Sequence, residues 1–347
     1  MSAAAASLVL RARVREGVVE HVEIVSPRAD PSPLFIGLAP AEAAILAGRL
    51  FSLCPAAQSL AALAAGEVAA GVAVDEREIR ARGLKLLCER LGEMLRASLL
   101  DWPADGAPAS DDIAALREAL KLLRALPENG GDLFPRLSEV AGALGLGDGS
   151  GVFVRQMAEA RADSETTQFS AVPLDPLRVE DDPAVWDAMT CDAAFARLPA
   201  LPGRCPETGA AARQRCAEGG LAARLAARRA DMAATLEAIG RVIEGGAAPN
   251  GLIAVRGDGA GGGFAAVDSA RGRLHHALRL DDAGRIADYH IVAPTEWNFH
   301  PQGPFARALL GATIGQGATA KRRVERLAFV FDPCIRAVAE ISDQSHA

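Results

Sequence analysis

Residues 75–100 place the strongest constraint on how this chain of 347 residues folds. The stretch DEREIRARGLKLLCERLGEMLRASLL repeats apolar residues at helical spacing and contains no proline, which predicts one long amphipathic helix. Cys88 falls on its apolar face and is expected to be a core residue. Similar patterns predict further helices over residues 40–65, 111–125 and 209–244. Since Ala and Leu dominate the composition, we expect these helices to pack closely.

Two further segments alternate apolar and polar residues, as strands do. Residues 7–25, SLVLRARVREGVVEHVEIV, predict a β-hairpin, and residues 264–293 predict strands joined by a turn. The expected fold class is therefore mainly α with small β elements (α+β), in a single domain over residues 1–347. Its expected parts are a β-hairpin at 7–25, a helical core at 40–245, a β segment at 264–293 and C-terminal helices at 304–342.

Composition and motifs argue against several functions. The net charge of −7 leaves no excess of Lys and Arg to neutralise phosphates, so no nucleic-acid partner is expected. No run of 18 apolar residues occurs and the N-terminus lacks a signal-peptide pattern, so we expect no membrane association and a cytoplasmic location. The glycine-rich residues 257–263 are not followed by Gly-Lys-Ser/Thr, so they predict a turn rather than a phosphate-binding loop.

Two of the six cysteines stand where thiol chemistry is favoured. Asp332-Pro333-Cys334 combines a good N-cap, a residue preferred at the first helical position and a thiol in the first turn. This order predicts a C-terminal helix whose dipole favours a thiolate. Cys54 precedes Pro55, which interrupts a helical pattern, so it too is expected at a helix start. Thiolates ligate soft metals, but the residues alone leave open that both are buried structural cysteines.

The sequence around both cysteines resembles a known family. FDPCIRAVAE resembles the C-terminal motif DPC-x-x-C-x-x-H of nickel–iron hydrogenase large subunits, and GRLFSLCPAAQSLA resembles their N-terminal motif R-x-C-x-x-C-x-x-x-H. The stretches LPGRCPETGAAAR and SARGRLHHALRL resemble two further segments of that family in the same order. The resemblance implies the large-subunit fold, which is mainly helical and brings the two cysteine segments together at its centre.

The departures from the family motifs limit the chemistry. In the family four cysteines hold nickel and iron, whereas Phe51 and Ala337 stand here in place of two of them. Gln58 and Glu340 replace the two motif histidines. Because a nickel ion would lose half of its thiolates, the resemblance implies that no nickel is bound and that the chain is not a working hydrogenase.

The residues that remain belong to the iron side of the family site. The resemblance implies that Cys54 and Cys334 are iron ligands, and that Arg271 lies beside cyanide ligands of the iron, to which a guanidinium can donate hydrogen bonds. This pattern is similar to the HupK-type hydrogenase expression/formation proteins, which are degenerate relatives of the large subunit. That similarity implies a non-catalytic maturation factor that serves as a transient scaffold or carrier for iron with cyanide and carbonyl ligands.

The same similarity implies partners and leaves alternatives. The expected partners are a cyanide- and carbonyl-delivery complex, a small metallochaperone and the hydrogenase large-subunit precursor. One alternative is a metal-free, chaperone-like protein that binds maturation partners. Another is an enzyme, either a divergent hydrogenase or a thiol enzyme, and the latter needs a histidine base near a cysteine.

Some other residues are secondary candidates. His275 and His276 are adjacent on a predicted strand, so at most one of them faces the site, and we name His275 as a possible neighbour of the iron ligands. Glu207 either lies close to the site or is structural. Arg336 either places positive charge near the lost nickel position or faces solvent. Asp332 is expected to act mainly as a cap, and Cys205 and Cys216 are taken as incidental thiols.

Overall fold

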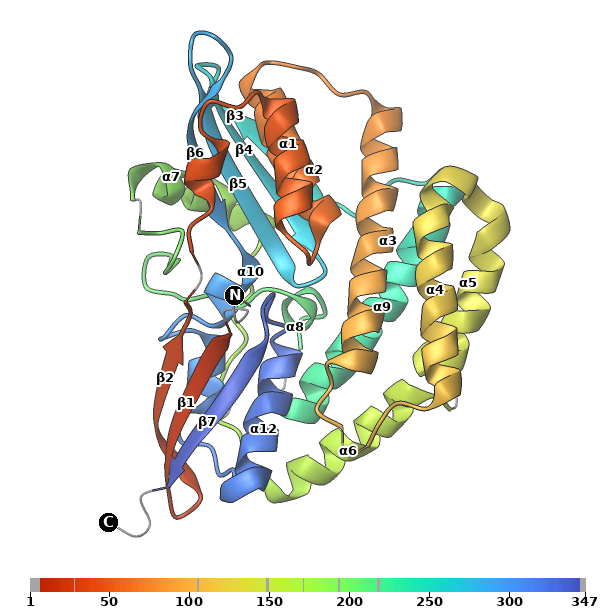
Figure 1. Cartoon of the computed structure of the whole chain (residues 1–347), viewed down its shortest axis with the longest axis vertical. Coiled ribbons are helices and arrows are strands. Elements are labelled where there is room, and N and C mark those ends of the chain that lie inside the picture. Colours follow the sequence, from red (N-terminus) through yellow and green to blue (C-terminus); the bar gives the residue numbers. More distant parts are fainter. Residues whose placement is uncertain are drawn as a thin grey trace, which may run out of the picture.

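The computed structural model describes residues 7–27, 29–104, 106–147, 150–170, 172–192, 194–216 and 219–343. Two small sheets lie one above the other on one side of the molecule, and long helices form the other side (Figure 1). The predicted α+β class with mainly helical content is confirmed. Short 3-10 or π turns also occur, at Ser32–Phe35, Gly130–Leu133, Gly142–Leu146 and Val179–Asp181.

The long helices form one side of the core. They are α3 (Glu76–Leu100), α4 (Ser110–Asn129), α5 (Phe134–Ala141), α6 (Val152–Thr166) and α9 (Leu221–Ile243). The predicted helix over 75–100 is confirmed as α3, where Asp75 caps the first turn by accepting from the Glu78 N–H group, and Cys88 is buried as expected. The predicted helix over 209–244 is instead two helices. A short α8 (Ala210–Arg213) ends before α9 begins, because the intervening Arg215 takes a positive φ of 49°.

The upper sheet is a four-stranded antiparallel meander in the order β3-β4-β5-β6. Its strands are β3 (Ile253–Gly257), β4 (Gly262–Ser269), β5 (Gly272–Leu280) and β6 (Ile286–Val292). The predicted β segment therefore contains three of them, while β3 was not predicted. The glycine-rich stretch is the turn between β3 and β4, where Asp258 accepts from the Ala260 and Gly262 N–H groups, as the sequence predicts.

Helices cover both faces of this sheet. One face packs on α2 (Pro55–Ala69), which is preceded by α1 (Pro40–Leu50), so the predicted helix break at Pro55 is confirmed. The other face packs near α7 (Asp182–Cys191) and α10 (Pro294–Asn298). Helix α2 and strand β4 approach so closely that only glycine fits at position 263.

The lower sheet corrects a prediction about the C-terminus. Its order is β2-β1-β7, with β1 (Leu8–Arg15) and β2 (Val18–Val25) as the predicted hairpin and β7 (Ala337–Asp343) parallel to β1. The predicted helix after Asp332 is wrong. Helix α11 (Pro304–Leu309) and α12 (Gly317–Val330) end earlier, and the chain continues as β7 because its alternating residues complete the edge of β1 and bury Ala339.

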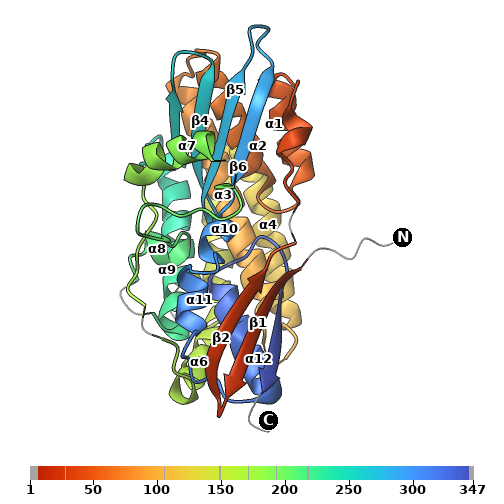
Figure 2. The same cartoon turned by 90° about the vertical axis from the view of Figure 1, so that its left-hand side faces the viewer.

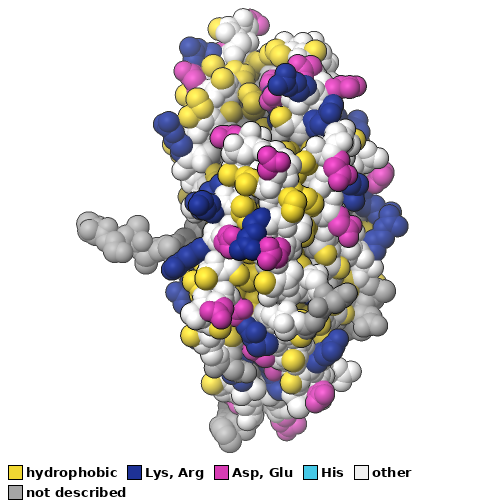
Figure 3. Space-filling view, turned by 90° about the vertical axis from the view of Figure 1, so that its right-hand side faces the viewer, with side chains coloured by type: hydrophobic (Ala, Val, Ile, Leu, Met, Phe, Trp, Pro, Cys, Tyr) yellow, Lys and Arg dark blue, Asp and Glu magenta, His cyan; other side chains and the backbone are white. Residues whose placement is uncertain are grey.

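The surface shows no concentration of one charge sign on the face that carries α4 and α5 (Figure 3). Basic and acidic side chains lie interspersed there with small apolar areas. Seen from the opposite side, the two sheets stand in line, with α10 between them and α11 beside the lower sheet (Figure 2). Within the described parts of the chain, no helix is both long and apolar enough to cross a membrane.

Candidate functional site

Arg271 joins the two cysteine segments at the centre of the molecule. It lies in the turn between β4 and β5, and only 3% of it is exposed. Its Nη1 group donates to the Cys54 sulfur at 3.0 Å, and its Nε group donates to the Pro333 carbonyl at 3.4 Å. The segments that contain Cys54 and Cys334 are far apart in sequence, yet both contact this one guanidinium, as the expected fold requires. Burial acts to lower the pKa of Arg271, but nearby sulfurs and carboxylates outweigh it and raise that pKa, so the guanidinium stays charged.

Cys54 sits directly before α2 with a positive φ of 55°. Burial raises the pKa of Cys54 to about 12; Arg271 opposes this effect, while Glu89, Glu93 and Asp332 add to it. The backbone N–H groups at the start of α2 do little to stabilise a thiolate at Cys54. Those of Ala56 and Ala57 already donate to the Glu89 carboxylate, the latter at 2.8 Å. Cys54 thus lies at a helix start, as predicted, but its surroundings favour the neutral thiol.

Cys334 lies in the loop between α12 and β7, and not in a helix. Its N–H group donates to the Thr295 hydroxyl at 2.9 Å. Asp332, predicted to be a helix cap, instead follows α12 with a φ of 52° and binds two arginines: Arg228 at 2.6 Å and Arg271 at 3.6 Å. Burial acts to raise the pKa of Asp332, but the two guanidinium groups outweigh it and hold that pKa below its usual value. Asp332 thus fixes the loop and orients Arg271.

Helix α3 supplies two site residues that sequence reasoning missed. Glu93 contacts the Arg271 guanidinium at 3.3 Å and Arg96 at 3.6 Å. Glu89 lies one helical turn earlier and caps α2. Burial raises the pKa of Glu89, in part offset by the two backbone N–H groups it binds. The only signal in the sequence was two acidic residues four positions apart on the long helix, which resembles an ordinary solvated face.

The two adjacent histidines face opposite sides of the sheet, as predicted. His276 lies on the α2 side, where its ring contacts the Gln58 amide oxygen at 2.9 Å and the Tyr289 hydroxyl at 2.7 Å. His275 lies on the other side, 3.5 Å from Asp182 and against the ring of Trp297. Gln58 lies on α2, one helical turn after Cys54. Because His276 contacts Gln58, the histidine on the Cys54 side of the sheet is His276 rather than His275.

Acid should destabilise the protein through His276. Burial, with a contribution from His275, lowers the pKa of His276 in the folded state to about 3. In the unfolded chain this histidine binds a proton below about pH 6.5, whereas in the folded state it stays neutral down to about pH 3. Stability from this residue is present above pH 6.5 and is lost as the pH falls toward 3. Between pH 6.5 and 4 the loss should reach up to about 3 kcal/mol in urea unfolding, and His276→Gln should lose less. The same replacement at the exposed His21 serves as the control; equal pH dependence in both variants would contradict this account.

The remaining predicted residues lie outside the contact around Arg271. Glu207 is buried and forms an ion pair with Arg224, whose Nη2 donates a hydrogen bond to the Glu207 carboxylate at 2.9 Å. This contact favours the structural interpretation of Glu207. Arg336 is exposed, and its carbonyl accepts from the Leu8 N–H group at 2.9 Å, which favours the solvent-facing interpretation.

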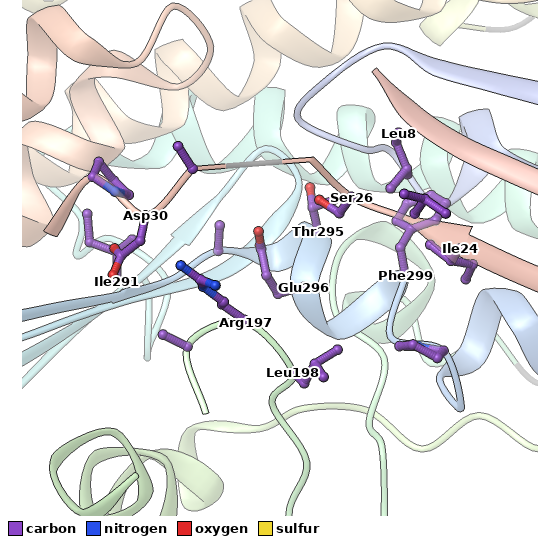
Figure 4. Close-up of a pocket in the computed structure, with 16 residues that line it drawn as sticks. Leu8, Ile24, Ser26, Asp30, Arg197, Leu198, Ile291, Thr295, Glu296 and Phe299 are labelled. Carbon is purple, nitrogen blue, oxygen red and sulfur yellow. The ribbon is translucent and has the colours of Figure 1, made fainter. Parts of the chain in front are cut away.

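A cavity of about 470 Å³ adjoins the Cys334 loop. Figure 4 shows it between the ends of the β1–β2 hairpin, the 196–198 loop and α10. Its lining is mixed, with apolar side chains beside polar and charged ones, and includes Leu8, Ile24, Asp30, Arg197, Thr295 and Phe299. Since the Thr295 hydroxyl binds the Cys334 N–H group, one wall of the cavity touches the loop that carries the second cysteine.

Among the described residues, no three His, Cys, Asp or Glu side chains gather as a metal-binding group. The sulfur donors near Arg271 are Cys54, which its guanidinium contacts, and Cys334 on the facing loop, which interacts electrostatically with the same guanidinium. Two sulfurs beside a guanidinium suit a metal that arrives with its own anionic ligands. They do not suit a bare ion that needs four protein ligands.

Comparison with known proteins decides the family. A hydrogenase expression/formation protein HupK from Rhizobium leguminosarum bv. viciae is 38% identical over 325 residues, covering 87% of each chain. The HupK protein of Bradyrhizobium diazoefficiens is 33% identical, covering 93% of each chain. The chain belongs to the HupK family of hydrogenase expression/formation proteins. The predicted resemblance to this family is thereby confirmed.

The fold of this HupK-family chain is that of the hydrogenase large subunit. The family model for nickel-dependent hydrogenase matches residues 247–339, a range that includes Arg271 and Cys334 but not Cys54. The chain is similar to the Ni-Fe-Se hydrogenase from D. vulgaris Hildenborough with a TM-score of 0.67 and 17% identity, covering 93% of this chain and 94% of that one. At that identity the likeness establishes the fold alone.

Proposed function

We propose that this protein acts in hydrogenase maturation as a non-catalytic scaffold or carrier for an iron unit with cyanide and carbonyl ligands. The supporting observation is the contact of one buried guanidinium, Arg271, with both cysteine segments. The names of its relatives, hydrogenase expression/formation proteins, support the broader role in maturation. The iron unit is cargo here, to be received and passed on.

Each residue of the site has a physical task in this proposal. Cys54 and Cys334 ligate the iron through sulfur, which suits a low-valent, soft metal. Arg271 donates N–H groups to the anionic cyanide ligands in a buried setting, where such charge-assisted bonds are strong. Phe51 and Ala337, at positions where large subunits carry cysteines, offer no donor atom, so iron is held without nickel.

The proposed exchange of cargo requires partners. A cyanide- and carbonyl-delivery complex would load the iron unit, with or without a small metallochaperone, and the hydrogenase large-subunit precursor would receive it. The alternative function is a metal-free, chaperone-like protein that binds these same partners. The buried Cys54 supports that alternative, since its surroundings by themselves favour the neutral thiol.

Infrared spectroscopy of protein purified without air from its native host tests the proposal. The wild type should show bands in the cyanide and carbonyl stretching region together with stoichiometric iron, and a Cys54→Ala, Cys334→Ala variant should show neither. Arg271→Lys keeps the charge but loses the planar fork, so its cyanide bands should shift or weaken while some iron remains.

A matched control makes the outcome specific. Cys191 is exposed and lies outside the site, so Cys191→Ala should keep all bands. Wild-type protein without bands and without iron, from cells with active hydrogenase, would refute the scaffold function and favour the metal-free alternative.

A further inference from the structure

The Glu93 carboxylate engages the part of the Arg271 guanidinium that remains for a ligand. Its Oε2 atom lies 3.4 Å from Nη1 and 3.3 Å from Nη2 of Arg271, so one oxygen contacts both Nη atoms. The Nε group donates instead to the Pro333 carbonyl, and Nη1 also donates to the Cys54 sulfur. Glu93 therefore binds the same N–H groups that would donate to anionic cyanide ligands.

The contact between Glu93 and Arg271 is long for a buried ion pair. Charge-assisted hydrogen bonds between nitrogen and oxygen usually measure about 2.7–2.9 Å. In the same cluster, the bond from Arg228 to Asp332 measures 2.6 Å. The Glu93 and Arg271 side chains are 17% and 3% exposed, so water competes little for either of them. Glu93 thus holds Arg271 loosely, and an incoming anion can displace it.

Arg96 offers Glu93 a second partner. Its Nη2 atom lies 3.6 Å from the same Glu93 oxygen and 3.1 Å from Asp101. Arg96 follows Glu93 by three residues on α3, so the two side chains are neighbours on one face of the helix. When Arg271 donates to another anion, Glu93 keeps Arg96 as its counter-ion. The carboxylate is then not left largely buried without a positive charge, which would be costly.

A carboxylate beside an anionic cargo weakens the binding of that cargo. Glu93 and the cyanide ligands carry charge of the same sign, and their repulsion is strong where solvent is largely excluded. Asp332 is also anionic, but Arg228 neutralises it at 2.6 Å. A permanent cofactor is best held without a competitor for its hydrogen-bond donors. A carrier, in contrast, must release what it holds, and Glu93 favours release.

We propose that Glu93 regulates the release of the iron unit by competing with it for Arg271. Without cargo, Glu93 binds Arg271. With cargo, Arg271 donates to the cyanide ligands and Glu93 pairs with Arg96. Only side chains move in this exchange, so no covalent bond forms or breaks and no proton is transferred. Glu93 is a positioning residue that shortens the lifetime of the loaded state, and this role rests on the proposed scaffold function.

The rate at which loaded protein loses its iron unit tests this role. Protein purified without air from its native host is given an excess of free thiol, which competes with Cys54 and Cys334 for iron. The decay of the protein-bound cyanide and carbonyl bands is then followed. Glu93→Gln keeps the size of the side chain without its charge, so its bands should decay at least about tenfold more slowly than those of the wild type.

Replacing Arg96 should have the opposite effect. Arg96→Gln leaves Glu93 with Arg271 alone, so the bands should decay faster than in the wild type. In the double variant they should decay as slowly as in Glu93→Gln, because Arg96 acts on the cargo only through Glu93. A merely structural role would not produce opposite effects that the double variant resolves in favour of Glu93. Should Glu93→Gln fold poorly, a wild-type rate in Arg96→Gln would overturn the proposal.

Thiocyanate binding to cargo-free protein separates this role from the scaffold function. Thiocyanate is a linear anion with a C–N group, and it forms no bond to thiols. A shifted C–N band should report its binding to Arg271, with at least about tenfold higher affinity in Glu93→Gln than in the wild type. Arg271→Gln should show no such band. The surface variant Glu118→Gln serves as the control and should match the wild type in both assays.

The two assays distinguish failure of this role from failure of the scaffold function. Iron bands that decay equally fast in the wild type and Glu93→Gln, with equal thiocyanate affinity or no thiocyanate band, would overturn the role of Glu93 and leave the scaffold function standing. Tighter thiocyanate binding in Glu93→Gln, in a protein that never carries iron, would support Glu93 as a competitor for Arg271 and refute the iron unit as the cargo.

Discussion

Replacing Glu207 with alanine should lower the free energy of unfolding by about 3–5 kcal/mol. Glu207 and Arg224 are both about 3% exposed and pair with each other, so the variant leaves a buried guanidinium without its carboxylate. Among the described residues, Arg224 would then retain the Gly219 carbonyl and the face of the Phe331 ring. Urea unfolding monitored by circular dichroism measures the loss.

A surface ion pair provides the control for this prediction. Glu118 pairs with Arg136 where both side chains are exposed and solvent screens the pair, so Glu118→Ala should cost far less than Glu207→Ala. If Glu207 is structural, iron per folded molecule should not change in Glu207→Ala. Normal stability together with lost iron would instead assign Glu207 to the metal site.

Replacing Gly263 with alanine should destabilise the protein by about 3 kcal/mol. A Cβ atom at this position would lie 2.1 Å from the Ala65 carbonyl oxygen and 2.8 Å from the Ala69 side chain. Both contacts belong to α2, so the helix must move away from β4. Since α2 begins directly after Cys54, the shift should also disturb the contact between Cys54 and Arg271.

The matched glycine replacement is Gly142→Ala. Gly142 has helical dihedral angles, and a Cβ atom there meets nothing within 4 Å, so alanine should be neutral or stabilise by up to about 1 kcal/mol. Comparable unfolding midpoints for the two variants would show that α2 can retreat from the sheet at no cost. That result would contradict the tight α2–β4 packing described above.

The sequence alone determined the features that depend on local pattern. The long apolar repeat specified α3, the alternation around Glu16-Gly17 specified the first hairpin, and Pro55 divided α1 from α2. The motifs also identified Cys54, Arg271 and Cys334 as one group, which the structure brings together, although their metal remains a prediction. These signals are short-range or carried by residue identity, so they can be detected without coordinates.

Only the tertiary structure decided how the residues near Cys334 fold and which groups surround Arg271. Asp332-Pro333 has the order of a helix start, but the open edge of β1 accepts residues 337–343 as a strand. The gain from completing a sheet and burying Ala339 exceeds a local capping preference of about 1 kcal/mol. Likewise, Glu89 and Glu93 look like a solvated helix face until α3 packs against α2 and the β4–β5 turn. Contacts between residues far apart in the chain set the charges around Cys54, and no local pattern encodes them.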